Sequence, residues 1–251
     1  MLEIRNFSAG YKGKQVLQDV SVSIPQGAVT VIAGPNGSGK STLLKALAGI
    51  LPATGSVLLE GRELLQLDRR ELAQTLAFLP QNRQIPEITA KNLVLHGRFP
   101  YLSYPRRYRA VDYHAAESAM NRMGVGDLAD RSMLKLSGGQ CQKVYIAMAL
   151  AQDTPVVLMD EPNTFLDIAH QLQLMEEAKA LAAEGKTVVL VLHDLTLALT
   201  YGDSLVVLQE GRCLFQGTAE EAFRSGCLDI AFGVKIQRFQ TSDGWKYYYK
   251  P

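Results

Sequence analysis

The sequence predicts an α/β fold with a parallel β-sheet core, an N-terminal antiparallel β subdomain and an inserted α-helical subdomain. The first sixty residues are rich in strand patterns. Later in the chain, short apolar runs alternate with helical segments, as in parallel strands joined by crossover helices. Between residues 89 and 151 the pattern is helical. We therefore expect one domain, with its core at residues 1–88 and 152–251 and the helical subdomain at residues 89–151.

The strand patterns of the N-terminal part are short and clear. Val20, Val22 and Ile24 alternate with polar residues, which is typical of a half-buried strand. A helix is expected over residues 41–49. Further strands are expected at residues 28–33, 56–59 and 76–79.

In the helical block, Thr89 is expected to cap a helix over residues 91–96. Asp112 is expected to cap a second helix that ends near Gly124.

After residue 151 the strand patterns return. A helix over residues 168–183 is expected between the first two strands, and a hairpin around Ser242-Asp243-Gly244 is expected in the tail. The strands themselves are expected at residues 155–159, 187–192 and 204–208.

Bulk composition narrows the protein class. The 251 residues are 47% hydrophobic and 20% charged, which suits a globular protein with a sizeable core. A net charge of +1 gives no overall attraction to nucleic acid or lipid. The three scattered cysteines predict neither zinc nor a disulfide framework and suit a reducing, cytosolic compartment. We expect no signal peptide and no transmembrane segment, because no apolar run is long enough.

The strongest motif, residues 34–41, reads GPNGSGKS and fits GxxxxGK[ST] between a predicted strand and a predicted helix. Its glycines let successive N–H groups curl around phosphates. We expect Lys40 to reach the β- and γ-phosphates and the Ser41 hydroxyl to bind Mg²⁺. The alternative is a chance glycine-rich turn, which the flanking elements disfavour. The motif therefore predicts a P-loop NTPase core that binds ATP.

Polar residues at the ends of other predicted strands extend this site. Asp160 can hold the Mg²⁺ water shell, and the neighbouring Glu161 can orient or deprotonate an attacking water. His193 and Gln81 also follow apolar strands, although a lone histidine or glutamine is more often structural. Tyr11 precedes a turn and can stack on adenine; an ordinary half-buried tyrosine fits the spacing nearly as well.

Residues 136–140 read LSGGQ and predict a second phosphate site. Ser137 and Gln140 fit a capping box at a helix start. A capping box does not require Gly138 and Gly139, which cost helix stability. Two glycines do allow close approach of the backbone to an anion at the helix N-terminus.

Together these motifs resemble the ATP-binding cassette (ABC) family of transporter ATPases. They occur in that family's order and cover nearly all of the chain. The resemblance implies a head-to-tail dimer in which the LSGGQ of one copy closes over the P-loop ATP of the other. Such a dimer would explain why one chain carries two phosphate sites, because the second site serves the nucleotide of the other copy. The matching segments are GPNGSGKST (34–42), Gln81, LSGGQ (136–140), VVLMDE (156–161), FLD (165–167) and His193.

The resemblance also implies roles. Tyr11 would stack on adenine, Gln81 would touch Mg²⁺ and sense a membrane subunit, and Glu161 would polarise the water. His193 would sense the γ-phosphate, and Asp167 would bridge the two copies. Catalytic roles fall on Glu161, His193, Gln81 and Lys40, and metal-binding roles on Ser41, Gln81 and Asp160. The implied ATP contacts are Tyr11, Gly34, Pro35, Asn36, Gly37, Ser38, Gly39, Lys40, Ser41, Thr42, Ser137, Gly138, Gly139, Gln140 and Asp167.

A narrower resemblance, to importer ATPases for iron–siderophore, haem and cobalamin, rests on residues 95–107, 161–171 and 229–239. It implies integral-membrane permease subunits, a second copy of the chain and, indirectly, a substrate-binding protein as partners. It also implies a peripheral location on the cytoplasmic side of the inner membrane. Cys141 and Asn163 depart from the family pattern, which commonly has a long polar residue and a threonine there. Alternatives are an importer ATPase for another substrate, such as free metal ions, or a soluble cassette acting in translation or DNA repair.

The stretch 97–109, hereafter the aromatic–arginine segment, suits a protein interface. It also fits nucleic-acid stacking or a solvated loop, but the near-zero net charge disfavours nucleic acid as a partner. We expect it to dock on a membrane subunit. Its aromatic and basic residues are Arg98, Phe99, Tyr101, Tyr104, Arg106, Arg107, Tyr108 and Arg109.

Overall fold

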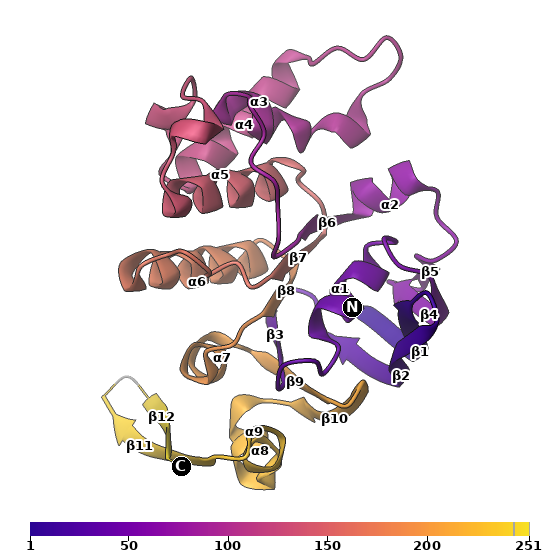
Figure 1. Ribbon diagram of the computed structural model, residues 1–251, viewed down its shortest axis with the longest axis vertical. Coiled ribbons are helices and arrows are strands. Elements are labelled where there is room, and N and C mark those ends of the chain that lie inside the picture. The colour runs from indigo at the N-terminus through magenta and orange to yellow at the C-terminus, as the bar shows by residue number, and fades with distance from the viewer. Residues whose placement is uncertain (243, 251) are drawn as a thin grey trace.

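The computed structural model describes residues 1–242 and 244–250, which form the two large sheets and the helices of Figure 1. One sheet has the strand order β10-β9-β3-β8-β7-β6, and the other has the order β2-β1-β4-β5. The strands of the first are β3 (Val29–Ala33), β6 (Leu76–Leu79), β7 (Val156–Asp160), β8 (Thr187–Val191), β9 (Ser204–Gln209) and β10 (Arg212–Gly217). The strands of the second are β1 (Leu2–Tyr11), β2 (Lys14–Ile24), β4 (Ala53–Leu59) and β5 (Arg62–Glu63).

The larger sheet is parallel from β9 through β6, and only β10 runs antiparallel to its neighbour. Its central strands are apolar on both faces, as expected for a parallel sheet covered on each side. Val31 and Leu190 face one core, which includes α5 and α6, and Ile32 and Val191 face the other. The predicted parallel core and its strands are therefore confirmed.

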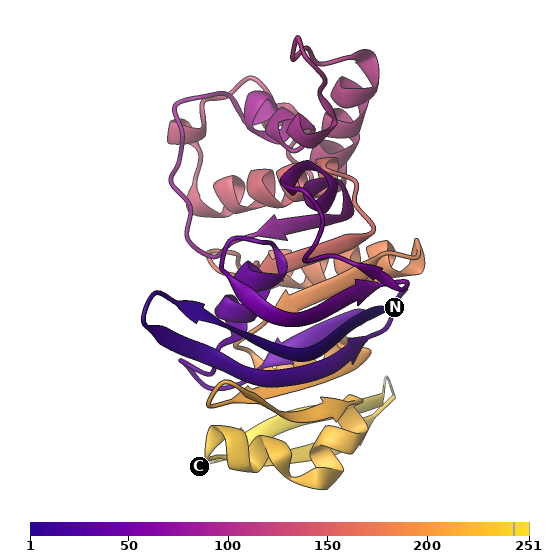
Figure 2. The ribbon, with the colours of Figure 1, turned by 90° about the vertical axis from the view of Figure 1, so that its right-hand side faces the viewer.

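Helix α1 (Lys40–Leu47) packs between the two sheets (Figure 2). Leu43, Leu44 and Leu47 are buried there with side chains from β1, β2 and β7. The N-terminal sheet is antiparallel, as predicted. This packing holds the loop between β3 and α1 at the carboxyl end of the central strand.

The segment between β6 and β7 is helical and lies above the parallel sheet in Figure 1. Thr89 caps the first helix, as predicted, by accepting from the Asn92 amide. The prediction that Asp112 caps the second helix is wrong. That helix begins at Ala110, and Asp112 accepts from the Arg109 amide from inside the first turn. The elements are α3 (Ala90–His96), η1 (Phe99–Tyr101), α4 (Ala110–Arg122), η2 (Gly126–Leu128), η3 (Met133–Lys135) and α5 (Gly138–Ala151).

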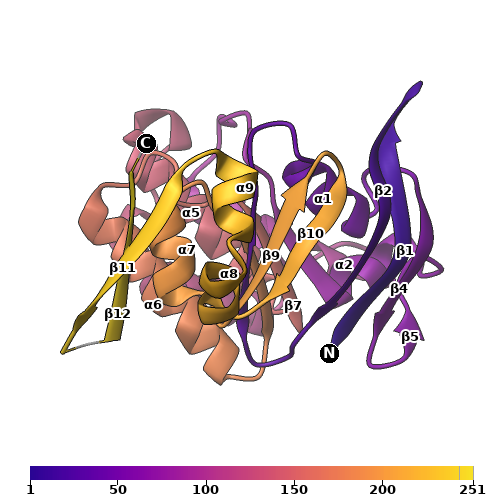
Figure 3. The same cartoon turned by 90° about the horizontal axis from the view of Figure 1, so that it is seen from below.

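The C-terminal strands β11 (Lys235–Thr241) and β12 (Gly244–Lys250) form the predicted hairpin, seen from below in Figure 3. Its predicted turn residue Asp243 and the last residue, Pro251, lie outside the described residues. In the described part of the chain, no helix has the length and apolar character needed to cross a membrane. The remaining helices are α2 (Arg69–Thr75), α6 (Ile168–Ala183), α7 (Leu195–Tyr201), α8 (Ala219–Ser225) and α9 (Cys227–Phe232).

The aromatic–arginine segment divides into a buried start and an exposed middle. Arg98 is buried, pairs with Asp112 across 3.2 Å and stacks on Tyr101 at 4.1 Å. Tyr104 is 97% exposed, and Arg107 is exposed as well. Arg98 is thus part of the folded core, whereas Tyr104 and Arg107 in the middle of the segment are free to meet a partner.

Candidate nucleotide site

The loop between β3 and α1 is wound tightly on itself. Gly34 has φ +150°, and a Cβ there would lie 2.2 Å from the Leu208 carbonyl oxygen. Gly39 precedes α1 with φ +106°, in the left-handed region that favours glycine. The Lys40 ammonium donates to the carbonyls of Gly34 and Pro35, at 2.8 and 2.9 Å. The loop therefore curls around its own lysine, as a phosphate cradle requires.

Ser41 and Asp160 bring α1 and the end of β7 together. The Ser41 hydroxyl donates to Asp160 Oδ1 across 3.0 Å, and the other carboxylate oxygen is buried with no partner among the described residues. Burial, reinforced by the Glu161 charge, raises the pKa of Asp160 above its ordinary value. Burial also lowers the pKa of Lys40, although both carboxylates oppose this shift.

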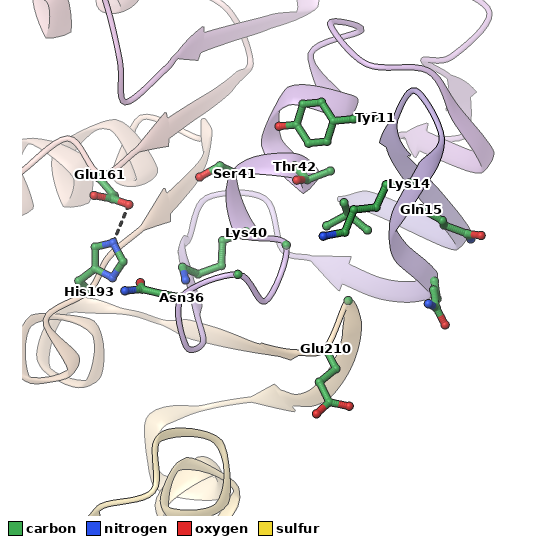
Figure 4. Close-up of a pocket in the computed structure, with 15 residues that line it drawn as sticks. Tyr11, Lys14, Gln15, Asn36, Lys40, Ser41, Thr42, Glu161, His193 and Glu210 are labelled. Atoms are coloured by element: carbon green, nitrogen blue, oxygen red, sulfur yellow. Dashed lines mark hydrogen bonds and ion pairs between the residues drawn. The ribbon is translucent and has the colours of Figure 1, made fainter.

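Glu161 joins three strand ends of the parallel sheet. Its carboxylate accepts from Gln81 Nε2 at 2.5 Å. The same carboxylate lies 2.5 Å from His193 Nε2 (Figure 4). Its backbone has φ +51°, which is unusual for a residue other than glycine, and its amide donates to the Val191 carbonyl. The structure therefore brings the three predicted strand-end residues into direct contact.

Lys40, Ser41, Glu161 and His193 line one cavity of about 440 Å³, whereas Gln81 and Asp160 contact these residues from outside its lining. Glu161 and His193 lie at one end of it, and Tyr11 lies at the other end, beyond the loop (Figure 4). Sequence reasoning missed the wall contributed by β2 and by the turn between β9 and β10, because nothing in the local sequence marks these residues as binding. The missed lining residues are Lys14, Gln15, Val16, Gln18, Glu210 and Gly211.

The predicted second phosphate site lies in a different cavity, of about 550 Å³. Ser137 caps α5 and forms the predicted capping box with Gln140. A Cβ on Gly139 would lie 3.3 Å from the Phe165 carbonyl oxygen, so the loop before α6 packs closely here. Asp167 lines the same cavity and caps α6.

The predicted site residues therefore fall into two separate groups within one chain. Of the first group, Asn36, Gly37, Gly39 and Thr42 line the first cavity with Lys40 and Ser41. Of the second, Ser137, Gly139, Gln140 and Asp167 line the other cavity. Ser38, in the loop between β3 and α1 (hereafter the phosphate loop), is buried. A Cβ on Gly138 would lie 3.6 Å from the Phe165 side chain.

Comparison with known proteins identifies the family to which the chain belongs. Residues 17–164 match the family described as ABC transporter. The chain belongs to this family. It is one of the ATP-hydrolysing members, as the resemblance implied.

Relatives of this ABC ATPase include a siderophore transport system ATP-binding protein of Bacillus subtilis (strain 168). The two are 40% identical over 94% of this chain and 87% of the relative. Among solved structures, an inward-facing metal-chelate type ABC transporter superposes with a TM-score of 0.84 at 26% identity, covering 100% of this chain and 96% of the other. The dimeric structure of a bacterial ABC transporter cassette, MJ0796, gives 0.76 at 30% identity, covering 87% and 99%.

Proposed function

We propose that this chain is the ATP-hydrolysing subunit of an importer for iron–siderophore or a related metal chelate such as haem or cobalamin. It binds integral-membrane permease subunits on the cytoplasmic side of the membrane. A substrate-binding protein delivers the chelate to the permease. The similarity to a siderophore transport ATP-binding protein and to a metal-chelate type transporter supports this proposal.

Chemistry at the first cavity follows from its polar groups. Lys40 and the loop amides bind the phosphates, and Tyr11 holds the base at the far end of the cavity. Glu161 orients or deprotonates the attacking water, with Gln81 and His193 fixing its two carboxylate oxygens. Because Glu161 is nearly buried, its carboxylate is held in one orientation and does not rotate freely in solvent.

The residues at the end of β7 fit a magnesium ion. The unpartnered Asp160 oxygen and the Ser41 hydroxyl are hard oxygen ligands, and Mg²⁺ is usually held by one or two carboxylates together with substrate phosphates. Asp160, Ser41 and Gln81 would hold it. When bound, it neutralises charge that develops on the phosphates.

ATP-driven association of two copies is proposed because the nucleotide site is divided between two cavities of one chain. LSGGQ, at the start of α5, lines a cavity without Lys40 or Glu161, and the phosphate loop lines the other. Two copies arranged head to tail would unite each loop with the partner's LSGGQ. In this arrangement residues 89–151 act as an inserted subdomain that presents Ser137 to the partner's γ-phosphate.

A dimerisation experiment tests this arrangement. Glu161→Gln keeps shape but removes the base, so hydrolysis should fall by a factor of about a hundred or more. The ATP-bound dimer should then accumulate, as measured by size-exclusion chromatography with light scattering. Adding Ser137→Arg, or Lys40→Ala, should abolish the dimer. A Glu161→Gln protein that binds ATP yet remains monomeric with Ser137 intact would contradict closure by the isolated chain.

Uptake measurements test the cargo. Cells lacking the gene should lose uptake of a radiolabelled ferric siderophore, haem or cobalamin, and the wild-type gene should restore it. The Glu161→Gln gene is the matched control and should not restore uptake. Normal uptake of all three chelates in the deletion strain would refute the proposed cargo class.

A further inference from the structure

A closed ring of contacts joins the segment after β6, the helix α5 and Glu161. Gln81 donates to the Glu161 carboxylate, and two residues later Arg83 Nη2 donates to Gln142 Oε1 on α5. The Gln142 amide donates in turn to the carbonyl of Pro162 across 2.6 Å. Pro162 directly follows Glu161, so the ring closes through the chain itself.

The ring is buried at Gln142 and Glu161, and further contacts hold Arg83 in place, while Gln81 is exposed. Gln142 is only 3% exposed. The Arg83 guanidinium lies over the Tyr145 ring at 4.5 Å, and the Tyr145 hydroxyl donates to the Gln84 carbonyl across 2.6 Å. Burial lowers the pKa of Arg83, and its Nη1 is buried without a partner in the described part of the chain. The guanidinium is therefore held between the Tyr145 ring and the Gln142 side chain, so that it fixes Gln142 in place.

The backbone at Glu161 explains what the ring holds. A residue other than glycine is strained at φ +51°, and it persists there only when its surroundings fix it. The Glu161 amide is held by the Val191 carbonyl, and the next carbonyl, of Pro162, is held by Gln142. The conformation that aims the carboxylate at Gln81 and His193 is therefore anchored on one side by β8 and on the other by α5.

We propose that Gln142, backed by Arg83, is a positioning residue that aims Glu161 according to where α5 lies. Gln142 is five residues after Ser137 on the same helix, so a displacement of the LSGGQ end of α5 moves the group that anchors Pro162. Contact at LSGGQ is thereby transmitted to the carboxylate of the same chain. This inference rests on the role proposed above for Glu161.

Steady-state ATPase kinetics of Gln142→Glu and Arg83→Ala test the proposal. The glutamate can still accept from Arg83 but has no N–H to donate to the Pro162 carbonyl. We expect kcat to fall about tenfold to a hundredfold, the range for a misplaced catalytic group. KM for ATP should stay unchanged, because neither residue lines the phosphate loop. Arg83→Lys should recover part of the loss.

Gln152→Ala is the matched control. Gln152 is the C-cap residue of α5 and also joins the helix to the core, but it donates to the carbonyls of Ala73 and Leu76, at the opposite end of the helix from Ser137. Its loss should leave kcat within about twofold of wild type. An equal loss of kcat in Gln152→Ala and Gln142→Glu would mean that loosening of α5 is sufficient, and would overturn the proposal.

A second background separates positioning from general damage. If Gln142 acts through the Glu161 carboxylate, Gln142→Glu should have no further effect on the residual single-turnover rate of Glu161→Gln. The same fractional loss in both backgrounds, or wild-type kcat in Gln142→Glu, would overturn this inference alone. Wild-type hydrolysis by Glu161→Gln would instead overturn the proposed role of Glu161, and the inference with it. Thermal unfolding and ATP-binding stoichiometry confirm that each variant is folded.

Discussion

The ion pair between Arg98 and Asp112 gives a stability prediction whose size follows from its surroundings. The Asp112 side chain is fully buried, and that of Arg98 is 9% exposed. Removing one partner of a buried pair costs about 3–5 kcal/mol. In Asp112→Ala the Arg98 guanidinium still donates to the carbonyls of Ala151 and Gln152, which favours the lower end of this energy range. The Arg109 backbone amide loses its acceptor, which costs about 1 kcal/mol. We therefore expect a loss of about 3–4 kcal/mol in the free energy of unfolding.

Urea unfolding followed by circular dichroism measures this loss. Glu71→Ala is the control, because it removes an exposed pair with Arg62 and should cost less than about 1 kcal/mol. If Asp112→Ala were no less stable than Glu71→Ala, the reasoning from burial would be refuted.

The same pair predicts a pH dependence. Burial alone would raise the pKa of Asp112, but the Arg109 amide and the Arg98 guanidinium outweigh it, so the pKa is lowered. A carboxyl whose pKa is lower in the folded state than its unfolded value of about 3.9 stabilises the fold fully above that value. Its contribution is lost as the pH falls through the folded pKa. The stability difference between wild type and Asp112→Asn should therefore shrink below about pH 4.

Two further predictions concern the exposed middle of the aromatic–arginine segment and Cys141, which departs from the family pattern. Changing Tyr104 and Arg107 to Ala should leave basal ATPase activity intact but weaken co-purification with the permease and uncouple transport; equal loss of basal activity would place the segment in the catalytic fold. Tyr101, packed under Arg98, is unsuited to this test. Cys141 is buried, burial raises its pKa, and its Sγ contacts the Met133 carbonyl. Burial raises the pKa of Cys213 as well, so exposure alone separates the two thiols. A thiol reagent should therefore label the half-buried Cys213 first, and rapid labelling of Cys141 in the folded protein would contradict its burial.

Features encoded by local chemistry were predictable from the sequence. Helix α6 has the predicted bounds because Asp167 caps its start and an apolar face continues to its end. The phosphate loop was evident because its glycine spacing is itself the structural requirement. Helix α2 was not predicted, since none of its residues is buried and no apolar periodicity marks it.

Features that depend on contacts between distant segments were not predictable. The error at Asp112 has a local cause instead, because an acid near a helix start fits either the cap position or the first turn. Arg83 and Gln142 are 59 positions apart, and neither stands out in its own segment. The cavity wall from β2 and the β9–β10 turn has the same origin, because tertiary packing alone brings it to the phosphate loop.

The position of β3 in the sheet has a consequence for synthesis of the chain. Its neighbours on both sides, β8 and β9, begin only at Thr187 and Ser204, more than 150 residues after β3. The loop that follows β3 also needs Gly211, whose amide donates to the Ser38 carbonyl. While a ribosome has made the chain only as far as residue 186, the entire GPNGSGKST motif is present but its strand lacks both of its neighbours in the sheet. A nascent chain that ends there should therefore bind no nucleotide, and the ATP-binding pocket arises only after β8, β9 and Gly211 have been made.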